Sequence, residues 1–263
     1  MKMVPKNTVE LQKMRAAGRM AAMVLDYITP FVKEGANTLE INGKIEAFIV
    51  ANGAKSATIG YKGYTHASCI SINDVVCHGI PDAKTILTDG DIVNIDVTVI
   101  VDGFYGDTSR MYWIGNVSET AKKLTRVTYD AMMAGIHSIA SGVPLNAIGN
   151  AIEAHVSPYG YGIVREYCGH GLGRRFHEDP MVLHYATHNP KAPLLRKGVT
   201  FTVEPMVNTG TWRTFTEADG WTVKTVDGGL SAQFEHSVAV TEDGVEILTE
   251  SPMGYRCPPY NIG

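Results

Sequence analysis

The chain contains the stretch Gly90-Asp91-Ile92-Val93-Asn94-Ile95-Asp96, and 108 positions later it contains Gly198-Val199-Thr200-Phe201-Thr202-Val203-Glu204. Each stretch begins with glycine, is rich in residues that favour strands and ends on a carboxylate. A glycine pair upstream keeps nearly the same offset, because Gly53 corresponds to Gly160. Self-similarity at a fixed offset is typical of a duplicated structural unit. The sequence therefore predicts two related halves.

The two halves also share their acidic residues. Asp96 corresponds to Glu204, and Asp107 corresponds to Glu235 if the second hairpin carries an insertion of about twenty residues. A single acidic residue in a strand usually faces water or closes a salt bridge. Two acidic pairs at repeated positions instead favour a sheet with pseudo-twofold symmetry, in which each half supplies one pair to a common site.

The spacing of apolar residues predicts two helices before the strands of each half. Asn7 and Asn37 are each followed three positions later by glutamate, which is typical of a helix start. Apolar residues then recur every three or four positions. The predicted helices cover residues 7–30, 37–53, 118–140 and 144–156. The predicted strands include residues 68–76, 90–101 and 104–114. Asp102-Gly103 offers a tight turn between the last two strands.

The first hairpin places two carboxylates on one face of the sheet. If the strands pair across the tight turn, Asp96 lies opposite Ser109 and diagonal to Asp107, at roughly 7 to 8 Å. Carboxylates this close in a partly buried sheet repel each other and lose hydration, so they bind protons unless a cation neutralises them. Because two more carboxylates come from the second half, we expect two divalent ions in preference to one.

Composition limits the classes of protein. The 263 residues are 44% hydrophobic, which suffices for one compact domain. The formal net charge of -4 does not favour a nucleic-acid partner. No run of 18 apolar residues occurs, so we expect a soluble, cytoplasmic protein without a membrane segment. Four cysteines without a CxxC pair indicate neither a disulfide framework nor a zinc knuckle.

The segment Tyr167-Cys168-Gly169-His170-Gly171-Leu172-Gly173-Arg174-Arg175-Phe176-His177 contains the pattern GHGxGxxxH. With it, the chain resembles the type I methionine aminopeptidases over roughly residues 5–250. The other motifs that carry the resemblance are Cys77-His78-Gly79-Ile80-Pro81, Asn94-Ile95-Asp96-Val97, Gly106-Asp107-Thr108, Val203-Glu204-Pro205 and Gln233-Phe234-Glu235-His236. Glycines beside His170 allow the backbone to pass close to a metal cluster.

The resemblance implies a fold and an activity. The fold is the α+β pita-bread fold, a curved and mostly antiparallel sheet with helices on its outer face. The chain would form one metallopeptidase domain, residues 1–263, with halves at about 1–117 and 118–250. The activity is removal of the initiator methionine from nascent polypeptides with a small second residue. We expect a monomer without a nucleic-acid substrate, and the ribosome is a candidate contact.

The resemblance also implies the metal ligands. Asp96 would bind one ion, Asp107 and Glu235 would bridge both, and His170 and Glu204 would complete the shell of the other ion. Four carboxylates and one imidazole suit Co, Mn, Fe(II) or Zn in a catalytic role. Glu204 would also move a proton between the attacking water and the departing amine.

Further residues match positions of the family that contact the substrate. His177 would donate a hydrogen bond to the scissile carbonyl oxygen, and His78 would contact the substrate backbone beyond the cleaved bond. The methionine side chain would lie among Tyr61, Tyr64, Cys69, Phe176 and Trp221. A monovalent cation would lie at Asn73, Val75 and Ser231. The remaining histidines keep a structural or surface interpretation.

Two alternatives compete with this interpretation. A proline-directed dipeptidase or aminopeptidase of the same fold would carry an additional N-terminal domain, whereas few residues precede the first predicted helix here. A non-catalytic pita-bread binding protein would have lost metal ligands, and all five are present. The 27 positions between His177 and Glu204 favour the type I form. The chain departs from related sequences at Thr58 and in the loop 186–197, where substrate preference could differ.

Overall fold

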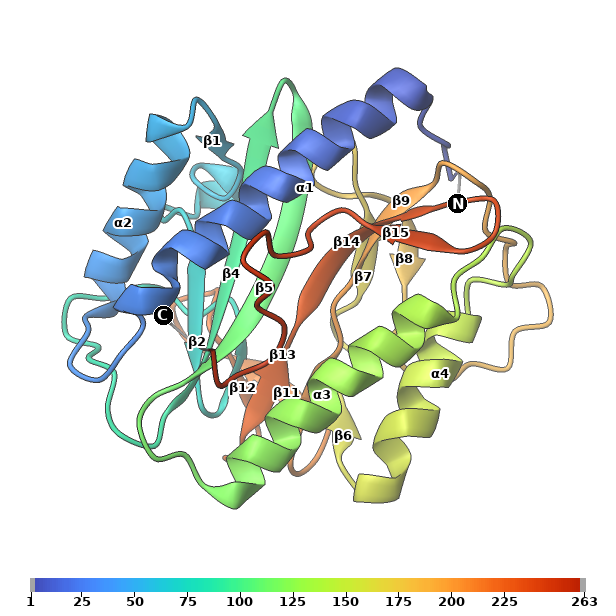
Figure 1. Cartoon of the computed structure of the whole chain (residues 1–263). Helices are drawn as coiled ribbons and strands as arrows, with labels where there is room; N and C mark the ends of the chain where they lie inside the picture. Colours follow the sequence, from blue (N-terminus) through green and yellow to red (C-terminus); the bar gives the residue numbers. More distant parts are fainter. Residues whose placement is uncertain (1–2, 261–263) are drawn as a thin grey trace.

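The computed structural model describes residues 3–260 and is drawn in Figure 1. Its α-helices are α1 (Thr8–Ile28), α2 (Thr38–Ala51), α3 (Glu119–His137) and α4 (Ala147–Val156), and its short 3-10 helices are η1 (Thr29–Phe31), η2 (Tyr61–Gly63) and η3 (Ser157–Tyr159). The strands of the first half are β1 (Lys55–Ser56), β2 (Cys69–Ile72), β3 (Val75–Cys77), β4 (Ile92–Val101) and β5 (Phe104–Trp113). The later strands are β6 (Gly162–Ile163), β7 (Gly169–Gly171), β8 (Glu178–Val182), β9 (Thr200–Val203), β10 (Met206–Asn208), β11 (Thr214–Thr216), β12 (Val223–Thr225), β13 (Ser231–Gln233), β14 (Glu235–Val240) and β15 (Val245–Ile247).

One antiparallel sheet joins strands from both parts of the sequence. Within residues 3–260 it has nine strands, in the order β1-β4-β5-β14-β9-β7-β8, with β2 also beside β4 and β15 also beside β14. Two smaller sheets, β13-β10-β6 and β11-β12-β3, adjoin it. The hairpins β4–β5 and β9–β14 meet where β5 pairs with β14, so the two predicted acidic pairs come from adjacent hairpins.

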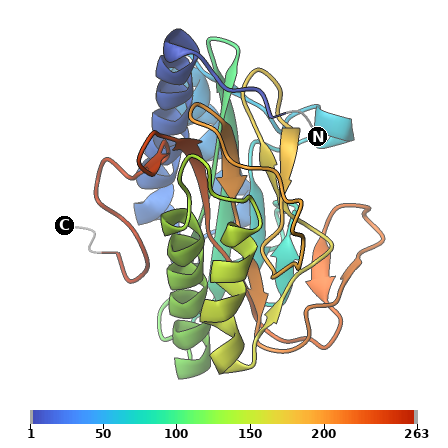
Figure 2. The ribbon, with the colours of Figure 1, turned by 90° about the vertical axis from the view of Figure 1, so that its right-hand side faces the viewer.

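The helices cover one face of this sheet. Figure 2 shows them on one side, while the segment 209–226 (orange) projects on the other. Strand β4 packs its residues Val93, Ile95, Val97 and Val99 against α1 and α2, and β9 packs Phe201 and Val203 against α3 and α4. Because side chains alternate along a strand, the polar residues of β4 and β9 point to the opposite face. Each fully buried aliphatic side chain contributes about 1.5–3 kcal/mol to stability.

The predicted helix starts are confirmed at three caps. The Asn7 side chain accepts from Glu10 N, and Glu10 returns the bond in a capping box. Asn37 caps α2 in a similar way, and Ser118 caps α3. The second-half helices are shorter than predicted, because residues 138–146 form a loop instead. That loop pairs with the segment 193–195 through Leu145 N and Pro193 O, at 2.9 Å.

The predicted strand 68–76 is wrong as one element. It divides into β2 and β3 at Asn73, whose φ of 54° lies in the left-handed region. The Asn73 side chain is fixed there because its Oδ1 accepts from Ile92 N at 3.1 Å. Asparagine tolerates this conformation better than most residues do. As a result, β3 leaves the main sheet and pairs with β12.

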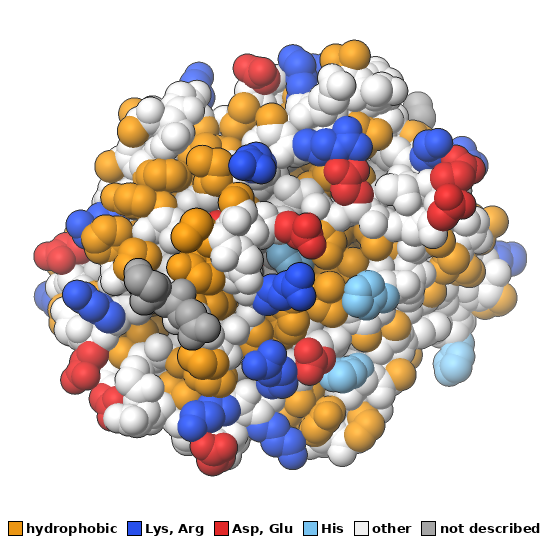
Figure 3. Space-filling model, viewed as in Figure 1, with side chains coloured by type: hydrophobic (Ala, Val, Ile, Leu, Met, Phe, Trp, Pro, Cys, Tyr) orange, Lys and Arg blue, Asp and Glu red, His pale blue; other side chains and the backbone are white. Residues whose placement is uncertain are grey.

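The surface over the helices is chemically mixed. Figure 3 shows apolar side chains there, interspersed with acidic and basic ones. Among residues 3–260, no helix is long and apolar enough to cross a bilayer.

Candidate metal centre

The first row of candidate ligands crosses four neighbouring strands. Asp96 on β4 lies opposite Ser109 on β5, and Ser109 lies opposite Glu235 on β14. On the far side of β14, Val203 pairs with His236, so the next residue, Glu204, lies opposite Glu235. The row therefore holds three of the four predicted carboxylates on the face of the sheet that the helices leave open.

The second row lies two residues away on the same face. Thr98 pairs with Asp107, and Ser237 pairs with Thr202. Ser237 also joins this row to β5, because its hydroxyl donates to Asp107 O at 2.7 Å. The N–H of His170 on β7 donates to Thr202 Oγ1 at 2.9 Å, which places the imidazole at the end of the row. Strand pairing thus brings both acidic pairs and the histidine together.

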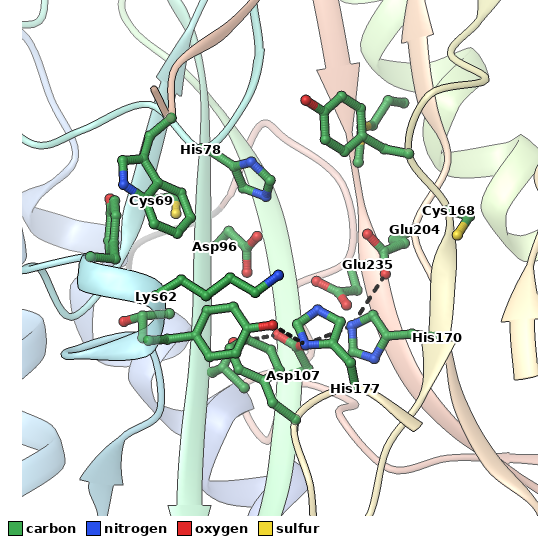
Figure 4. Close-up of a pocket in the computed structure, with 18 of the residues that line it drawn as sticks. Lys62, Cys69, His78, Asp96, Asp107, Cys168, His170, His177, Glu204 and Glu235 are labelled. Atoms are coloured by element: carbon green, nitrogen blue, oxygen red, sulfur yellow. Dashed lines mark hydrogen bonds and ion pairs between the residues drawn. The ribbon is translucent and has the colours of Figure 1, made fainter. Parts of the chain in front are cut away.

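The ligand atoms of three residues converge most closely. One atom from each of Asp107, His170 and Glu235 lies within 4.8 Å of the other two. His170 Nε2 is 3.5 Å from Asp107 Oδ2 and 3.8 Å from Glu204 Oε1. Asp96 and Glu204 lie outside the tightest group but line the same cavity. Figure 4 shows all five side chains directed into that cavity.

Most of the candidate acidic ligands are shielded from water. Asp107, Glu204 and Glu235 are 4%, 8% and 2% exposed. Burial, together with the charges of Asp107 and Glu204, raises the pKa of both Asp96 and Glu235 well above the usual range. Burial also raises the pKa of Glu204, to about 7. Without a cation these carboxyl groups retain protons that they would lose in water.

The pKa of the imidazole is also raised, but by its acidic neighbours and not by burial. Burial alone would lower the pKa of His170, but its hydrogen bond with Asp107 and the charge of Glu204 raise that pKa to about 9. One imidazolium does not balance four carboxylates. A divalent cation satisfies both tendencies, because it replaces protons on the acids and binds the neutral imidazole. The residues present therefore fit a metal centre rich in oxygen ligands.

Hydroxyl and imidazole groups form hydrogen bonds with the candidate ligands. Thr98 Oγ1 donates to Asp107 Oδ1 at 2.7 Å, and Thr202 Oγ1 donates to Glu204 Oε1 at 2.6 Å. The backbone N–H of Glu204 donates to His184 Nε2 at 3.1 Å. Burial lowers the pKa of His184 to about 3, so its ring is neutral and can accept this bond. No local pattern in the sequence indicates this contact of His184, whereas the threonines lie two residues from predicted ligands.

The cavity over the ligands has a volume of about 470 Å³. All residues predicted to contact the substrate line it, namely Tyr61, Tyr64, Cys69, His78, Phe176, His177 and Trp221. Aromatic rings form much of the wall: Phe176 lies 4.9 Å from Tyr61, and Trp221 lies 5.0 Å from Tyr64 between centroids. Cys69 lies opposite Asp96 in the β2–β4 pairing, and burial raises the pKa of its thiol.

The two predicted substrate histidines are both directed into this cavity in Figure 4. The ring of His177 lies 4.1 Å from that of His170, and its Nδ1 lies 3.1 Å from the Tyr61 hydroxyl. Burial and the charge of His170 lower the pKa of His177 to about 4. Burial likewise lowers the pKa of His78, whose backbone adopts a φ of 58°. Both rings are therefore neutral near pH 7, and each carries one N–H that can donate.

Sequence reasoning missed several lining residues. They are Lys62, Thr98, Glu166, Tyr167, Cys168 and Met206, and Thr58 also lines the cavity. Lys62 extends across the cavity in Figure 4, from a backbone with a φ of 46° between Gly60 and Gly63. Gly60 and Gly63 are the sequence feature that could have indicated this unusual loop.

The residues predicted to hold a monovalent cation also lie near one another. Ser231 N donates to Asn73 O at 2.8 Å, and Val75 begins β3 directly after this turn. Within the described part of the chain, the buried Ser231 hydroxyl has no hydrogen-bond partner. The role of these three residues stays a prediction.

Comparisons with known proteins agree with this site. The model of Metallopeptidase family M24 matches residues 12–242. The methionine aminopeptidase of Escherichia coli (strain K12) is 51% identical over 245 residues, which cover 93% of this chain and 92% of that protein. The crystal structure of methionine aminopeptidase from Rickettsia prowazekii is similar with a TM-score of 0.92 and 49% identity, over 94% of this chain and 100% of that chain.

A more distant structure shares the fold alone. The prolidase from Pyrococcus horikoshii OT3 has a TM-score of 0.76 at 21% identity, covering 95% of this chain and 64% of that chain. The predicted α+β pita-bread fold is thereby confirmed, and the methionine aminopeptidases are favoured over the proline-directed relatives by identity. This chain belongs to metallopeptidase family M24 and, within that family, to the type I methionine aminopeptidases.

Proposed function

We propose that this chain removes the initiator methionine from polypeptides whose second residue is small. The observation that carries the proposal is the cavity itself, in which an acidic metal site forms the floor and aromatic residues form the wall. Methionine aminopeptidases about half identical in sequence support the same activity.

The metal site would hold two divalent ions. Asp96 would bind one ion, Asp107 and Glu235 would lie between both, and His170 and Glu204 would bind the other. The family implies a divalent metal, and the donor set suits Co, Mn, Fe(II) or Zn. When bound, such ions activate water and polarise the carbonyl group of a peptide bond. The convergence of Asp107, His170 and Glu235 within 4.8 Å supports the binding of one common ion by these three residues.

Glu204 would act as the proton carrier. Its pKa of about 7 reflects a site in which burial disfavours the ionised form, and Thr202 orients one of its oxygens at 2.6 Å. A carboxylate held in this way can take a proton from the attacking water and return it to the departing amine. Its backbone N–H is also bonded to His184, which helps to hold the end of the strand in place.

The neutral imidazoles would contact the substrate at two points. His177 would donate to the scissile carbonyl oxygen as negative charge develops there, and its low pKa keeps it free of a charge that would repel the ions. His78 would donate to or accept from the substrate backbone beyond the cleaved bond. Its ring packs edge-on against Tyr167 and Trp221, at 5.6 and 6.1 Å between centroids, which limits its rotation.

The methionine side chain would enter the wall formed by Tyr61, Tyr64, Cys69, Phe176 and Trp221. Polarizable sulfur packs well against aromatic rings. A pocket of this kind distinguishes side chains that differ by one methylene by about 1–3 kcal/mol. Thr58 lines the same cavity and is the residue that we expect to alter contacts at its rim.

We also propose that the chain acts as a monomeric single domain in the cytoplasm, on nascent polypeptide N-termini. The ribosome is a candidate contact. Asn73, Val75 and Ser231 would hold a monovalent cation, and the unpartnered Ser231 hydroxyl supports a ligand there.

One assay tests the proposed function. Metal-free protein is reconstituted with each candidate metal, and free amino acid is measured from Met-Ala-Ser, Met-Pro and Ala-Ala-Ser. We expect methionine release from Met-Ala-Ser and little release from the other two peptides. Preferred cleavage of Met-Pro would instead support the proline-directed alternative, and no cleavage with any metal would support a binding protein.

A further inference from the structure

The loop that carries Phe176 and His177 lies between the cavity and the N-terminal segment. It joins β7 to β8 and covers residues 172–177. On the cavity side, Phe176 stacks on Tyr105 at 5.7 Å, with 23° between the ring planes, and His177 contacts the Tyr61 hydroxyl. The position of this loop therefore sets the position of two substrate-contacting side chains.

One carboxylate binds two backbone groups of the loop, in addition to the backbone hydrogen bonds at Leu172 and Gly173. Glu178 Oε1 accepts from the backbone N–H groups of Arg174 and Arg175, both at 3.1 Å. These two bonds close the loop onto the residue that follows His177. Because these N–H groups occupy Oε1, the other oxygen, Oε2, remains available to a positive neighbour.

Lys6 supplies that positive neighbour from the start of the chain. Its Nζ lies 2.7 Å from Glu178 Oε2, and the two side chains are only 8% and 15% exposed. The Lys6 backbone is fixed as well, because its N–H donates to Gly198 O at 2.8 Å. The lysine stem crosses Gly173 so closely that a Cβ at that glycine would collide with Lys6 Cε. The N-terminal segment is thus fitted onto the loop.

A second ion pair joins the same two segments but is more exposed. Arg174 Nε lies 3.3 Å from Glu10 Oε1, and the arginine side chain is 66% exposed. Solvent screens such a pair, which usually contributes little. The Lys6–Glu178 pair is therefore the less exposed of these two ion pairs.

We propose that Lys6 is a positioning residue for the aminopeptidase reaction: by pairing with Glu178, it fixes the loop that presents Phe176 and His177 to the substrate. This inference rests on the proposed function, because it takes the roles of these two residues from there. Misplacement of a catalytic group by about 1 Å can slow a reaction by about a hundredfold. Loss of the ion pair loosens a loop that other contacts still hold. We therefore expect a smaller loss of activity than this.

The test compares Lys6→Met with Lys6→Arg and Arg15→Met. Arg15 forms a bidentate pair with Glu246 at 2.6 and 2.7 Å, away from the loop, so its substitution is a matched control for the loss of an ion pair from the same region. On Met-Ala-Ser, we expect Lys6→Met to lower kcat about tenfold with a smaller change in KM. Metal content should stay near that of Arg15→Met, whereas Tm should fall further than in Arg15→Met because the Lys6–Glu178 pair is the less exposed of the two. Lys6→Arg should restore kcat to within about twofold of the wild type, since it keeps the charge.

A double-mutant cycle separates positioning from general destabilisation. If Lys6 acts through His177, then Lys6→Met in a His177→Ala background should lower kcat further by less than about twofold. An equal loss of kcat in both backgrounds would overturn the inference, and so would an equal loss in Arg15→Met. Absence of activity in the wild-type protein would count against the proposed function instead.

Discussion

The metal-free protein should be stabilised when the proton carrier is neutralised, even though activity is lost. In Glu204→Gln, the amide keeps the shape of the side chain and removes its charge. The carboxyl group of Glu204 has a usual pKa of 4.5, and burial raises this pKa to about 7 in the folded chain. Folding therefore favours the protonated form, which an amide resembles at every pH.

The size of this stability difference follows from the pKa values of Glu204 in the unfolded and the folded chain. Below pH 4.5 the group is protonated in both folded and unfolded chains, so it does not change the free energy of unfolding. Between pH 4.5 and 7 only the folded chain holds the proton, and the free energy of unfolding falls by about 1.4 kcal/mol per pH unit. The loss is complete above pH 7, at about 3 kcal/mol. For a chain of this size, this corresponds to roughly 6–12 °C in Tm.

The assay is thermal unfolding of the chelator-treated wild type and Glu204→Gln at pH 5 and pH 8. We expect the variant to have the higher Tm at pH 8 and a much smaller advantage at pH 5. Addition of a divalent metal should raise the Tm of the wild type more than that of the variant, which lacks a ligand. Glu242→Gln, at an exposed site where solvent screens its ion pair with Lys197, should change Tm only slightly at both pH values. If the metal-free variant is no more stable than the metal-free wild type at pH 8, burial does not disfavour the ionised form of Glu204.

Three further outcomes are expected. Asp96→Asn should lower activity by orders of magnitude while far-UV circular dichroism stays that of the wild type, since a ligand is lost and the shape is kept; wild-type turnover would exclude Asp96 from the metal site. His177→Ala should lower kcat with stoichiometric metal retained, as measured by elemental analysis, and loss of the metal would show that His177 is a ligand instead. A chain produced with Lys2 after Met1 should keep Met1 in cells that contain only similar enzymes, because lysine is not small; both residues lie outside the described part of the structure, and intact-mass spectrometry decides the outcome.

The register of the first hairpin could be predicted because its turn is short. With Asp102-Gly103 as the two-residue turn, Val101 must pair with Phe104, and all later pairs follow. The turn therefore predicts that Asp96 lies opposite Ser109, and the pairing is confirmed. The same logic does not extend to the second hairpin, where four short strands are inserted between the two acidic residues.

Other features depend on contacts between distant segments and leave no local pattern. The predicted second-half helices were too long because residues 193–195 pair with the loop before α4, and helix periodicity contains no information about that pairing. His184 lies twenty positions before Glu204 and reaches its backbone only through the fold. Lys6 and Glu178 are 172 positions apart, so their contact could not be inferred from either neighbourhood.

The duplicated sheet also explains why four acids, three of them buried, can be held in one orientation. Each acid has a hydroxyl residue two positions away on its own strand, and therefore on the same face: Asp96 with Thr98, Asp107 with Ser109, Glu204 with Thr202, and Glu235 with Ser237. Strand pairing aligns these eight residues in two rows across the sheet. In each row, hydroxyl groups lie next to carboxylates. Thr98 and Thr202 use this placement to donate directly to Asp107 and Glu204. Hydroxyl donors favour the ionised form of an acid without adding a positive charge that would compete with a metal ion. The alternation that hides the apolar residues beneath the helices thus also supplies the ligands with their hydrogen-bond donors.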